Sequence, residues 1–520
     1  MKHVFSRKRT CRWKRLRVIM AALFLAALLS AVNLSQQSPP AGASTQEFSA
    51  YLDDRMPKWM RQYGVPGASI ALLRDGELVW SGAYGYADLE KKREMTVDAV
   101  FRVESISKSL TAWGILRLVE EGRLDLNAPV QDYLHSWSLP ETEYSEDGVT
   151  VRRLLSHNSG LPLGRIDLRY PPQSQIPTLR ETLTQEARLI NEPGSGFSYA
   201  NTGFDLLELV IEDVTGRDFA GFMAGEIMQP LRMQNSSFEW NETFNARIPT
   251  GYDLKGRAVQ LYVTPTKGSG GLFATVEDIA RFAIAEMGRA GDVSPVVLSP
   301  ESIDLLHQPQ VDVLDVYGLV SDGYGFGHFI EILPDGRRAV WHGGQGNGWM
   351  AHFHLVPESG DGIVILTNSQ RSWPVFAQLL SAWARWSGFR TVKMGRITYG
   401  VAAVWALAGL FALTALWQAG QLILGLRRGT RSFAPFSSRS CTRRLILAVL
   451  GAGGAAACVW CAAQPYLLVL SIFPGAVDWA GMSLFILSVI LFLSALFPLK
   501  DLLAARQTDA RHRALALTGR

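Results

Sequence analysis

The sequence predicts an α/β domain over residues 44–395, followed by a transmembrane helical region over residues 396–520. In the central part of the chain, paired apolar runs separated by turn residues occur together with amphipathic segments, a pattern typical of strands and helices in one globular domain. Nearer the C-terminus, three apolar stretches each exceed the length of about 20 residues that a helix needs to cross a bilayer. With 48% hydrophobic residues and a net charge of +4, the composition fits a protein attached to a membrane.

Residues 1–43 have the pattern of a signal peptide or a signal anchor. A strongly basic segment precedes the uncharged run from Val18 to Leu29, which is the order found in export signals. Ala41-Gly42-Ala43 offers a cleavage site, but it lies well beyond the apolar run, so removal of the leader and its retention as an anchor both stay open. We expect no nucleic-acid partner, because no binding motif accompanies the basic residues.

Two pairs of strands are predicted within the α/β domain. Ala68–Leu73 and Leu78–Tyr84 lie on either side of Arg74-Asp75-Gly76, a hairpin signal. Trp349–Leu355 and Gly362–Leu366 form a second pair, separated by a short polar turn.

Two helices complete the predicted core. Thr275 begins a helix with Asp278 three residues later, which resembles a capping box. Another helix, which carries Phe376, Leu379, Leu380 and Trp383, is expected to close the domain. The sequence leaves open whether Trp383 lies in the core or at a membrane interface.

The C-terminal region is expected to contain three transmembrane helices, at about 399–426, 445–472 and 477–497. Basic residues gather in the first loop (Arg427, Arg428, Arg431, Arg439, Arg443 and Arg444) and in the tail (Lys500, Arg506, Arg511 and Arg513). By the positive-inside rule both are cytoplasmic, which places the α/β domain outside; the basic N-terminus independently predicts the same side. We therefore expect a multi-pass cell-membrane protein with the lipid bilayer as a partner. The small residues Gly451, Gly453, Gly454 and Ala455 indicate close helix packing.

Ser105-Ile106-Ser107-Lys108 is the first of three segments that carry chemistry. Residues three apart on a helix share one face, so the amine of Lys108 can lie beside the hydroxyl of Ser105. An adjacent base can activate a serine as a nucleophile. The S-x-x-K pattern is a known signature of serine nucleophiles.

The second segment is Tyr199-Ala200-Asn201, which follows a turn rich in glycine. A phenol can transfer a proton if a nearby cation lowers its pKa. The side chain of Asn201 offers both a donor and an acceptor. A surface tyrosine beside a helix-capping asparagine is the alternative interpretation of this segment.

The third segment, Trp341-His342-Gly343-Gly344-Gln345-Gly346, continues a predicted strand. Glycines within a strand mark a close approach of the backbone by a ligand. A substrate carbonyl lying along this strand can meet the N–H of Gln345, with the N–H of Ser105 as a second oxyanion donor. A simple bend at a strand end is the alternative.

Together these segments resemble the serine β-lactamase and penicillin-binding protein superfamily, and within it the class C β-lactamase-like esterases and D-aminopeptidases. The likeness runs from about Glu47 to Phe389 and includes Phe101-Arg102-Val103, Leu154–Pro162 and Gly270–Thr275. It implies a β-lactamase/transpeptidase-like fold, in which helices flank an antiparallel sheet. It also implies a mostly helical subdomain between the first and third segments, with the nucleophile at the junction.

The resemblance also implies the roles of the site residues. Ser105 is expected to be acylated, with Lys108 and Tyr199 as the catalytic proton-transfer pair and Asn201 as a contact for a substrate amide. Either Lys108, kept neutral by burial and neighbouring positive charge, or Tyr199 as a phenolate would remove the serine proton.

His342, Gly343, Gly344 and Gln345 are expected to bind substrate. His342 occupies the place where many relatives carry lysine. Because histidine is mostly neutral at pH 7, this departure favours an ester or amide without a strongly acidic group at that point.

The predicted function is a membrane-anchored, extracytoplasmic serine hydrolase that acts on a small-molecule or peptide substrate. A D-amino-acid-specific cell-wall peptidase or transpeptidase, or a β-lactamase, is the second interpretation. A catalytically idle ligand-binding or sensor module is the third. No cofactor or metal is predicted, since the histidines form no known ligand motif, and His157 is expected to fix a loop. The cysteines lie outside the hydrolase region, at Cys11, Cys441, Cys458 and Cys461.

Overall fold

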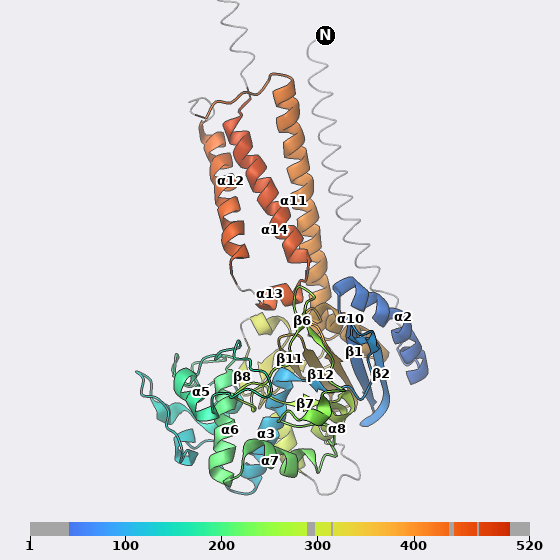
Figure 1. Ribbon diagram of the computed structural model, residues 1–520, viewed down its shortest axis with the longest axis vertical. Helices are drawn as coiled ribbons and strands as arrows, with labels where there is room; N and C mark the ends of the chain where they lie inside the picture. The colour runs from blue at the N-terminus through green and yellow to red at the C-terminus, as the bar shows by residue number, and fades with distance from the viewer. Residues whose placement is uncertain (1–40, 289–296, 314–315, 436–440, 465–466, 500–520) are drawn as a thin grey trace, which may run out of the picture. The chain divides into compact units, whose positions relative to one another are not determined.

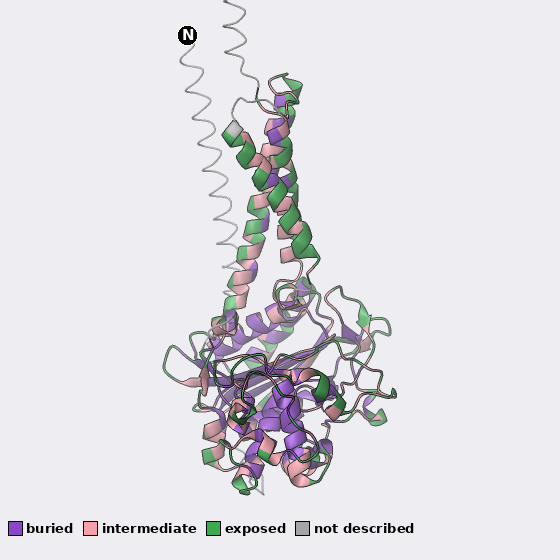
Figure 2. Ribbon diagram, turned by 90° about the vertical axis from the view of Figure 1, so that its left-hand side faces the viewer, coloured by how far each residue is buried: buried purple, intermediate pink, exposed green. Residues whose placement is uncertain are grey.

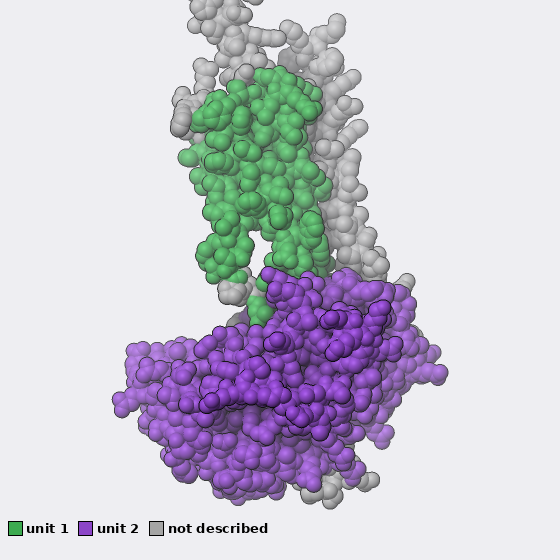
Figure 3. Space-filling model, in the orientation of Figure 1, with its two compact units in different colours: residues 1–36, 399–520 green, residues 37–398 purple. Residues whose placement is uncertain are grey.

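The computed structural model describes residues 41–288, 297–313, 316–435, 441–464 and 467–499. The chain divides into two compact units: residues 37–398, and residues 1–36 together with 399–520 (Figure 3). The predicted leader lies almost wholly outside the described residues, as do Cys11 and the basic tail.

A nine-stranded antiparallel sheet forms the centre of the unit of residues 37–398 (Figure 1). From edge to edge it contains β3 (Arg93–Glu94), β2 (Glu77–Asp88), β1 (Gly67–Arg74), β13 (Asp361–Thr367), β12 (Met350–Val356), β11 (Arg338–Gln345), β10 (Phe329–Ile332), β9 (Gly323–Tyr324) and β8 (Val311–Asp312). At its centre β1 pairs with β13, so that Ala68 lies opposite Thr367. The predicted antiparallel sheet is confirmed.

Both predicted strand pairs are confirmed. The loop between β1 and β2 is Asp75-Gly76, with φ of 54° and 81°. Two consecutive positive φ values give the turn whose twist matches that of a hairpin, and Asp-Gly is a favoured sequence for it. The second pair, β12 and β13, is joined across residues 357–360.

Helices cover both faces of the sheet. Side chains alternate along β1, and Ala71 and Leu73 share a buried core with Ile279 and Phe282 of α8 (Val276–Glu286). The other face is covered by α2 (Thr45–Tyr63) and α10 (Trp373–Trp386), which pack together through stacked rings of Phe48 and Trp386 with centroids 4.6 Å apart. Trp383 of α10 is fully buried against His354 of β12, so it belongs to the core and not to a membrane interface.

The start of α8 is predicted correctly, but the capping box is only half formed. The hydroxyl of Thr275 accepts the N–H of Asp278, as expected. The carboxylate of Asp278 does not return to Thr275. It accepts instead the N–H of Asn235 at 2.7 Å and the hydroxyl of Ser236 at 2.9 Å, so α8 is tied to a preceding loop.

The predicted helical subdomain lies between the short strands β4 (Phe101–Arg102) and β7 (Phe273–Ala274). Its helices are α3 (Ser107–Glu120), α4 (Val151–Leu155), α5 (Leu179–Glu186), α6 (Asn201–Thr215) and α7 (Phe219–Met223). It also holds the small sheet of β5 (Gly251–Tyr252) and β6 (Ala258–Val259); α9 (Pro300–Leu306) follows α8. Because α3 is buried along most of its length, it fixes the residues at its start against the sheet.

The second unit contains α11 (Arg396–Arg427), α12 (Cys441–Ala462), α13 (Leu467–Ile472) and α14 (Ala476–Leu496). Three helices here are long and apolar enough to cross a membrane: Lys393–Arg427, Thr442–Ala462 and Ala476–Leu496. Figure 2 shows their surfaces as largely exposed or intermediate. The predicted second span, 445–472, is too long. The helix ends at Ala462, and Leu467–Ile472 form the separate short helix α13.

The close packing indicated by the glycines of α12 is confirmed at two of them. A Cβ atom at Gly451 would lie 2.5 Å from the backbone nitrogen of Phe492, and one at Gly454 would lie 2.5 Å from Oγ of Ser488. Both partners belong to α14. Gly453 has no atom within 4 Å, so it faces away from this contact.

Candidate active site

Ser105 and Lys108 meet as the spacing predicts. Ser105 lies in a short 3₁₀ turn over Glu104–Ile106 that leads into α3, and Lys108 lies in the first turn of α3. Lys108 Nζ is 3.2 Å from Ser105 Oγ. Ser105 is partly exposed, whereas the side chain of Lys108 is fully buried. A substrate can therefore reach the hydroxyl while the amine stays away from solvent.

Glu104, directly before Ser105, has a φ of 50°, a conformation that residues other than glycine rarely adopt. Its carboxylate accepts the Nε–H of Arg102 and the hydroxyl of Tyr262, each at 2.9 Å. Its carbonyl oxygen accepts the hydroxyl of Ser107 at 2.6 Å. These bonds hold the strained residue and so fix the direction of the Ser105 side chain.

Lys108 is surrounded by acceptors. Its Nζ donates to Asn201 Oδ1 at 2.8 Å and to the carbonyl oxygen of Ser269 at 2.6 Å. Burial lowers the pKa of Lys108 to about 7, although the carboxylates of Asp205 and Glu104 act in the opposite direction. The expectation of neighbouring positive charge is therefore wrong. Desolvation alone makes the neutral amine accessible near neutral pH.

Tyr199 lies beside the same pair. Its hydroxyl is hydrogen-bonded to Ser105, and its ring centroid is 5.0 Å from Lys108 Nζ. Burial raises the pKa of Tyr199 above its usual range, with a further contribution from Tyr317. The phenol is thus neutral at ordinary pH. Of the two bases that the sequence left open, the electrostatics favour Lys108.

His157 holds the loop that carries Tyr199. Its Nδ1 accepts the N–H of Ala200 at 3.1 Å, and its carbonyl oxygen accepts the N–H of Ser198 at 2.8 Å. The imidazole is 4.2 Å from the Tyr199 ring, centroid to centroid. Burial lowers the pKa of His157 well below 6.5, so it stays neutral. The prediction that His157 fixes a loop is confirmed.

The glycines of β11 permit a close approach, as predicted, but the approaching group is the chain itself. A Cβ atom at Gly344 would lie 2.1 Å from the carbonyl oxygen of Val103, and one at Gly346 would lie 2.1 Å from Oε1 of Glu104. The strand therefore packs directly on the residues that precede Ser105. Between these glycines, the side chain of Gln345 accepts the indole N–H of Trp373 at 3.0 Å.

His342 lies next to the site but does not face open space. Its side chain is buried, with Nε2 at 3.1 Å from the hydroxyl of Tyr324 and Nδ1 at 2.9 Å from the carbonyl oxygen of Gly343. Burial lowers its pKa well below 6.5. His342 therefore offers no positive charge of the kind that a lysine would supply, and the structure does not favour its predicted contact with substrate.

Two acidic residues of α6 contribute to the site and were missed in the sequence. Glu208 accepts the N–H of Lys267 at 2.6 Å and that of Gly268 at 2.7 Å, which positions the loop whose Ser269 binds Lys108. Asp205 is also buried, and burial raises its pKa to about 6. Two carboxylates three positions apart within the apolar, buried stretch Phe204–Ile211 of α6 were the available signal, since buried charges need partners.

Among the described residues, one group of side chains could hold a metal ion: Glu286, His307 and His328, with ligand atoms within 4.8 Å of one another. The Glu286 carboxylate already contacts the Nε2 atoms of His307 at 2.6 Å and of His328 at 3.2 Å, and it accepts the indole N–H of Trp113. This buried network links α8 to α3. We interpret it as a support for the helix that follows the nucleophile.

The comparisons with known proteins agree with this geometry. A family model described as Beta-lactamase matches residues 48–383. The chain belongs to the beta-lactamase family. As a member, it has the β-lactamase/transpeptidase fold that the sequence predicts, and the family includes serine hydrolases such as esterases and class C beta-lactamases.

Curated members of the beta-lactamase family show moderate similarity. Protein flp of Staphylococcus aureus (strain MRSA252) is 25% identical over 318 residues, which cover 58% of this chain and 60% of Protein flp. The chain thus spans about 60% of the length of that relative. Esterase EstB of Burkholderia gladioli is 27% identical over 368 residues, which cover 62% of this chain and 90% of EstB.

Solved structures of the beta-lactamase fold are also similar. The octameric penicillin-binding protein homologue from Pyrococcus abyssi has a TM-score of 0.60 and 28% identity, and the match covers 69% of this chain and 81% of that one. A penicillin-binding protein from Bacillus halodurans has a TM-score of 0.51 and 26% identity, with 61% of this chain and 94% of that chain covered. A class C beta-lactamase, at 20% identity and a TM-score of 0.52 over 63% of this chain and 94% of its own, is similar in fold alone.

Proposed function

We propose that this member of the beta-lactamase family is a serine hydrolase that cleaves an ester or an amide through an acyl-enzyme on Ser105. The observation that carries the proposal is the buried Lys108, whose Nζ lies 3.2 Å from Ser105 Oγ and whose pKa is lowered to about 7. A base with a pKa near the working pH is the most effective in general-base catalysis. Esterase EstB, a relative at 27% identity, supports esters as the first substrates to try.

In the proposed first step, neutral Lys108 takes the proton of Ser105 while Oγ bonds to the substrate carbonyl carbon. The carbonyl oxygen becomes an oxyanion and accepts the backbone N–H groups of Ser105 and Gln345, each worth about 3 kcal/mol in the transition state. Asn201 uses its carbonyl oxygen on Lys108, so its amide N–H group is the part that can donate to the substrate.

In the second step, the tetrahedral intermediate collapses and the bond to the leaving group breaks. Tyr199 is neutral and hydrogen-bonded to Ser105, so it can donate its proton to the departing atom and recover one from Lys108. A water molecule then attacks the acyl carbon and gives one proton to neutral Lys108; the bond from the acyl carbon to Ser105 Oγ breaks, and Oγ takes that proton back through Lys108 or Tyr199. The products are the acid and the free alcohol or amine.

The proposal is tested by covalent labelling of the full-length protein in detergent. A fluorophosphonate should add one phosphonyl group, seen as a mass increase of the intact protein, and Ser105→Ala should remove it. Ser195→Ala is a matched control, because Ser195 is exposed on the loop before Tyr199. Labelling that persists in Ser105→Ala would contradict the assignment. The absence of labelling in the unaltered protein would favour the idle binding module.

Rates with nitrocefin, short-chain p-nitrophenyl esters and D-alanyl peptides would then separate the candidate activities. Hydrolysis of the esters alone supports an esterase. Release of D-alanine would favour the peptidase, and opening of nitrocefin the β-lactamase.

We further propose that the apolar helices anchor the protein in the cell membrane, with the hydrolase unit outside and the C-terminal tail in the cytoplasm. The arginines between the first two spans support this direction. The variant Ser195→Cys should react with a membrane-impermeant maleimide on intact cells, beyond any background from the native cysteines in the unaltered protein. Additional labelling only after permeabilisation would place the hydrolase unit on the cytoplasmic side.

A further inference from the structure

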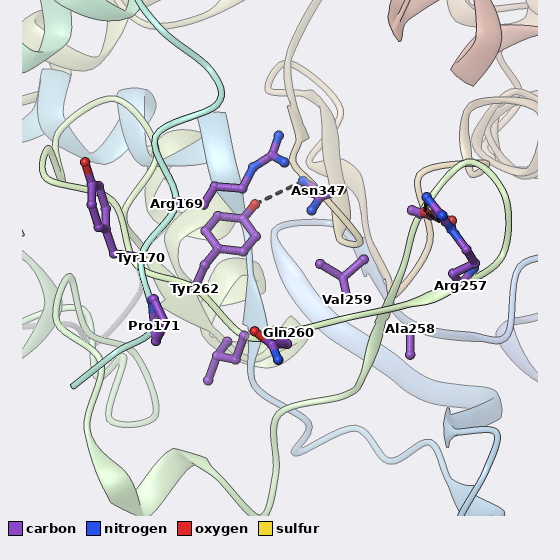
Figure 4. A pocket seen from close by; sticks show the side chains of 11 residues that line it. Arg169, Tyr170, Pro171, Arg257, Ala258, Val259, Gln260, Tyr262 and Asn347 are labelled. Carbon is purple, nitrogen blue, oxygen red and sulfur yellow. Dashed lines mark hydrogen bonds and ion pairs between the residues drawn. The ribbon is translucent and has the colours of Figure 1, made fainter. Parts of the chain in front are cut away.

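A cavity of about 610 Å³ opens beside Asn347, the residue that follows the third of the three segments (Figure 4). Its walls include Arg169 and Tyr170 from one loop, Arg257 and Tyr262 from another, and Asn347 after β11. The volume is in the range that binds a small molecule or a substituent of one.

One hydrogen-bond network joins this cavity to the nucleophile. The hydroxyl of Tyr262 donates to Glu104, next to Ser105, at 2.9 Å and accepts the N–H of Asn347 at 3.0 Å. Asn347 in turn follows Gln345 by two positions in the chain. The side chain of Tyr262 therefore ties the cavity wall to Glu104, next to Ser105, and to Asn347, close to Gln345. Since Ser105 and Gln345 are the proposed oxyanion donors, we expect part of a substrate bound there to extend along this wall.

Of the two arginines in the cavity wall, Arg257 has a close ion-pair partner and Arg169 has none among the described residues; the pKa of the nearby Asp167 is lowered by its pairing with Arg165 at 3.0 Å and further by the charge of Arg169. Arg257 is neutralised, since its guanidinium lies 2.7 Å from the carboxylate of Asp253. Arg169 has no carboxylate within 4 Å among the residues that the structure describes; it donates to the carbonyl oxygen of Ile166 at 3.2 Å. Its guanidinium carbon lies 5.6 Å from the centroid of the Tyr262 ring, on the side where Asn347 lies in Figure 4.

We propose that this cavity is a substrate subsite that binds a carboxylate, with Arg169 as the specificity-determining residue. Because a guanidinium presents several donors in one plane, it binds a carboxylate with directed hydrogen bonds as well as charge. The buried His342 supplies no cation to a substrate carboxylate. In the proposed subsite Arg169 supplies the positive charge instead, from the loop that also carries Tyr170. The preferred substrate is then an ester or amide that bears a carboxylate away from the scissile bond. This inference rests on the proposed hydrolase function.

The test compares two pairs of esters that differ only in one charge, with the full-length protein in detergent. The first pair is the p-nitrophenyl monoester of adipic acid and its methyl ester, which places the charge on the acyl side. The second pair is the butyrate ester of 4-hydroxyphenylacetic acid and its methyl ester, which places it on the leaving side. In one of the two pairs we expect a lower KM for the charged ester than for its methyl ester. That pair shows whether the acyl part or the leaving group of the substrate enters the cavity.

Arg169→Gln should raise that KM about tenfold, the usual size of one charge-assisted hydrogen bond, and leave kcat and the neutral esters unchanged. Arg257→Gln is the matched control and should have little effect, because its charge is already paired. Added salt should reduce the preference, since Arg169 is exposed.

Equal KM values within both pairs, or an equal effect of Arg169→Gln on charged and neutral esters, would overturn the subsite. In either case fluorophosphonate labelling and neutral-ester hydrolysis would still support the nucleophile, so the failure would concern the subsite alone. Loss of both labelling and hydrolysis in the unaltered protein would instead overturn the hydrolase function and the subsite with it.

Discussion

The buried amine of Lys108 predicts that acylation of Ser105 slows steeply below pH 7. The pKa of a lysine is ordinarily 10.5, and burial lowers that of Lys108 to about 7. The difference corresponds to about 5 kcal/mol, at about 1.4 kcal/mol per unit of pKa. Below pH 7 only the neutral fraction of the amine can accept the serine proton. The rate should therefore fall about tenfold per pH unit and reach about 1% of its plateau at pH 5.

The assay is the rate of labelling by a fluorophosphonate without an ionisable group, followed between pH 5 and pH 9 by the mass of the intact protein. A pH profile of the labelling rate with its midpoint near 7 is usually explained by a histidine. Burial lowers the pKa values of His157 and His342 well below 6.5, so neither accounts for a midpoint near 7 here. The midpoint then reports the amine of Lys108.

Asp205→Asn provides the matched variant. The carboxylate of Asp205 raises the pKa of Lys108, so its removal should shift the midpoint to lower pH. A flat profile between pH 5 and pH 9, a midpoint near 10, or an upward shift in Asp205→Asn would refute the assignment of Lys108 as the base.

The same pKa shift affects stability. Between about pH 7 and pH 10.5 the unfolded chain holds a proton on Lys108 that the folded chain has lost. Since the unfolded state binds more protons there, the contribution of this residue to the free energy of unfolding rises with pH over that window.

Three further predictions concern single substitutions. Tyr199→Phe should slow both acylation and deacylation roughly a hundredfold or more, measured by stopped-flow hydrolysis of a p-nitrophenyl ester; unchanged rates would mean that the leaving group takes its proton elsewhere. Gly344→Ala should cost about 1–3 kcal/mol of stability and slow fluorophosphonate labelling, because the new Cβ would lie 2.1 Å from the carbonyl oxygen of Val103. Gly270→Ala is the control: the nearest atom to its Cβ is 3.8 Å away, so its melting temperature should be unchanged. Gly451→Ala should lower the melting temperature in detergent, while Gly453→Ala, with nothing within 4 Å, should not; equal effects would contradict the packing of α12 on α14.

The parts of the fold that depend on local geometry could be predicted from the sequence. Asp75-Gly76 specifies its hairpin through two positive φ values, and the spacing of Ser105 and Lys108 alone brings their side chains together on a helical turn. The three candidate segments stand out through similarly short patterns, whereas the helical subdomain between the first and third is implied only by the resemblance to the β-lactamase superfamily.

The electrostatics of the site could not be predicted, because they depend on residues far apart in the chain. Lys108 donates its hydrogen bonds to Asn201 and Ser269, which are 93 and 161 positions away. The hydrogen bond between His342 and Tyr324 joins β11 to β9, two strands that β10 separates in the sheet, and the sequence does not reveal this order. For the same reason, the glycines at the end of β11 predicted a close approach by a ligand, whereas the group that approaches Gly344 is the backbone of Val103.

The pairing of β1 with β13 constrains how the protein can fold as it is synthesised. Ala68 has no strand partner on that side until Thr367 has emerged from the ribosome, nearly 300 residues later. The hairpin of β1 and β2 must therefore wait with one edge unpaired, and contacts of such long sequence separation form slowly. We expect the centre of the sheet to close last, only after almost the whole unit of residues 37–398 is available, and the nascent chain to depend until then on protection from aggregation.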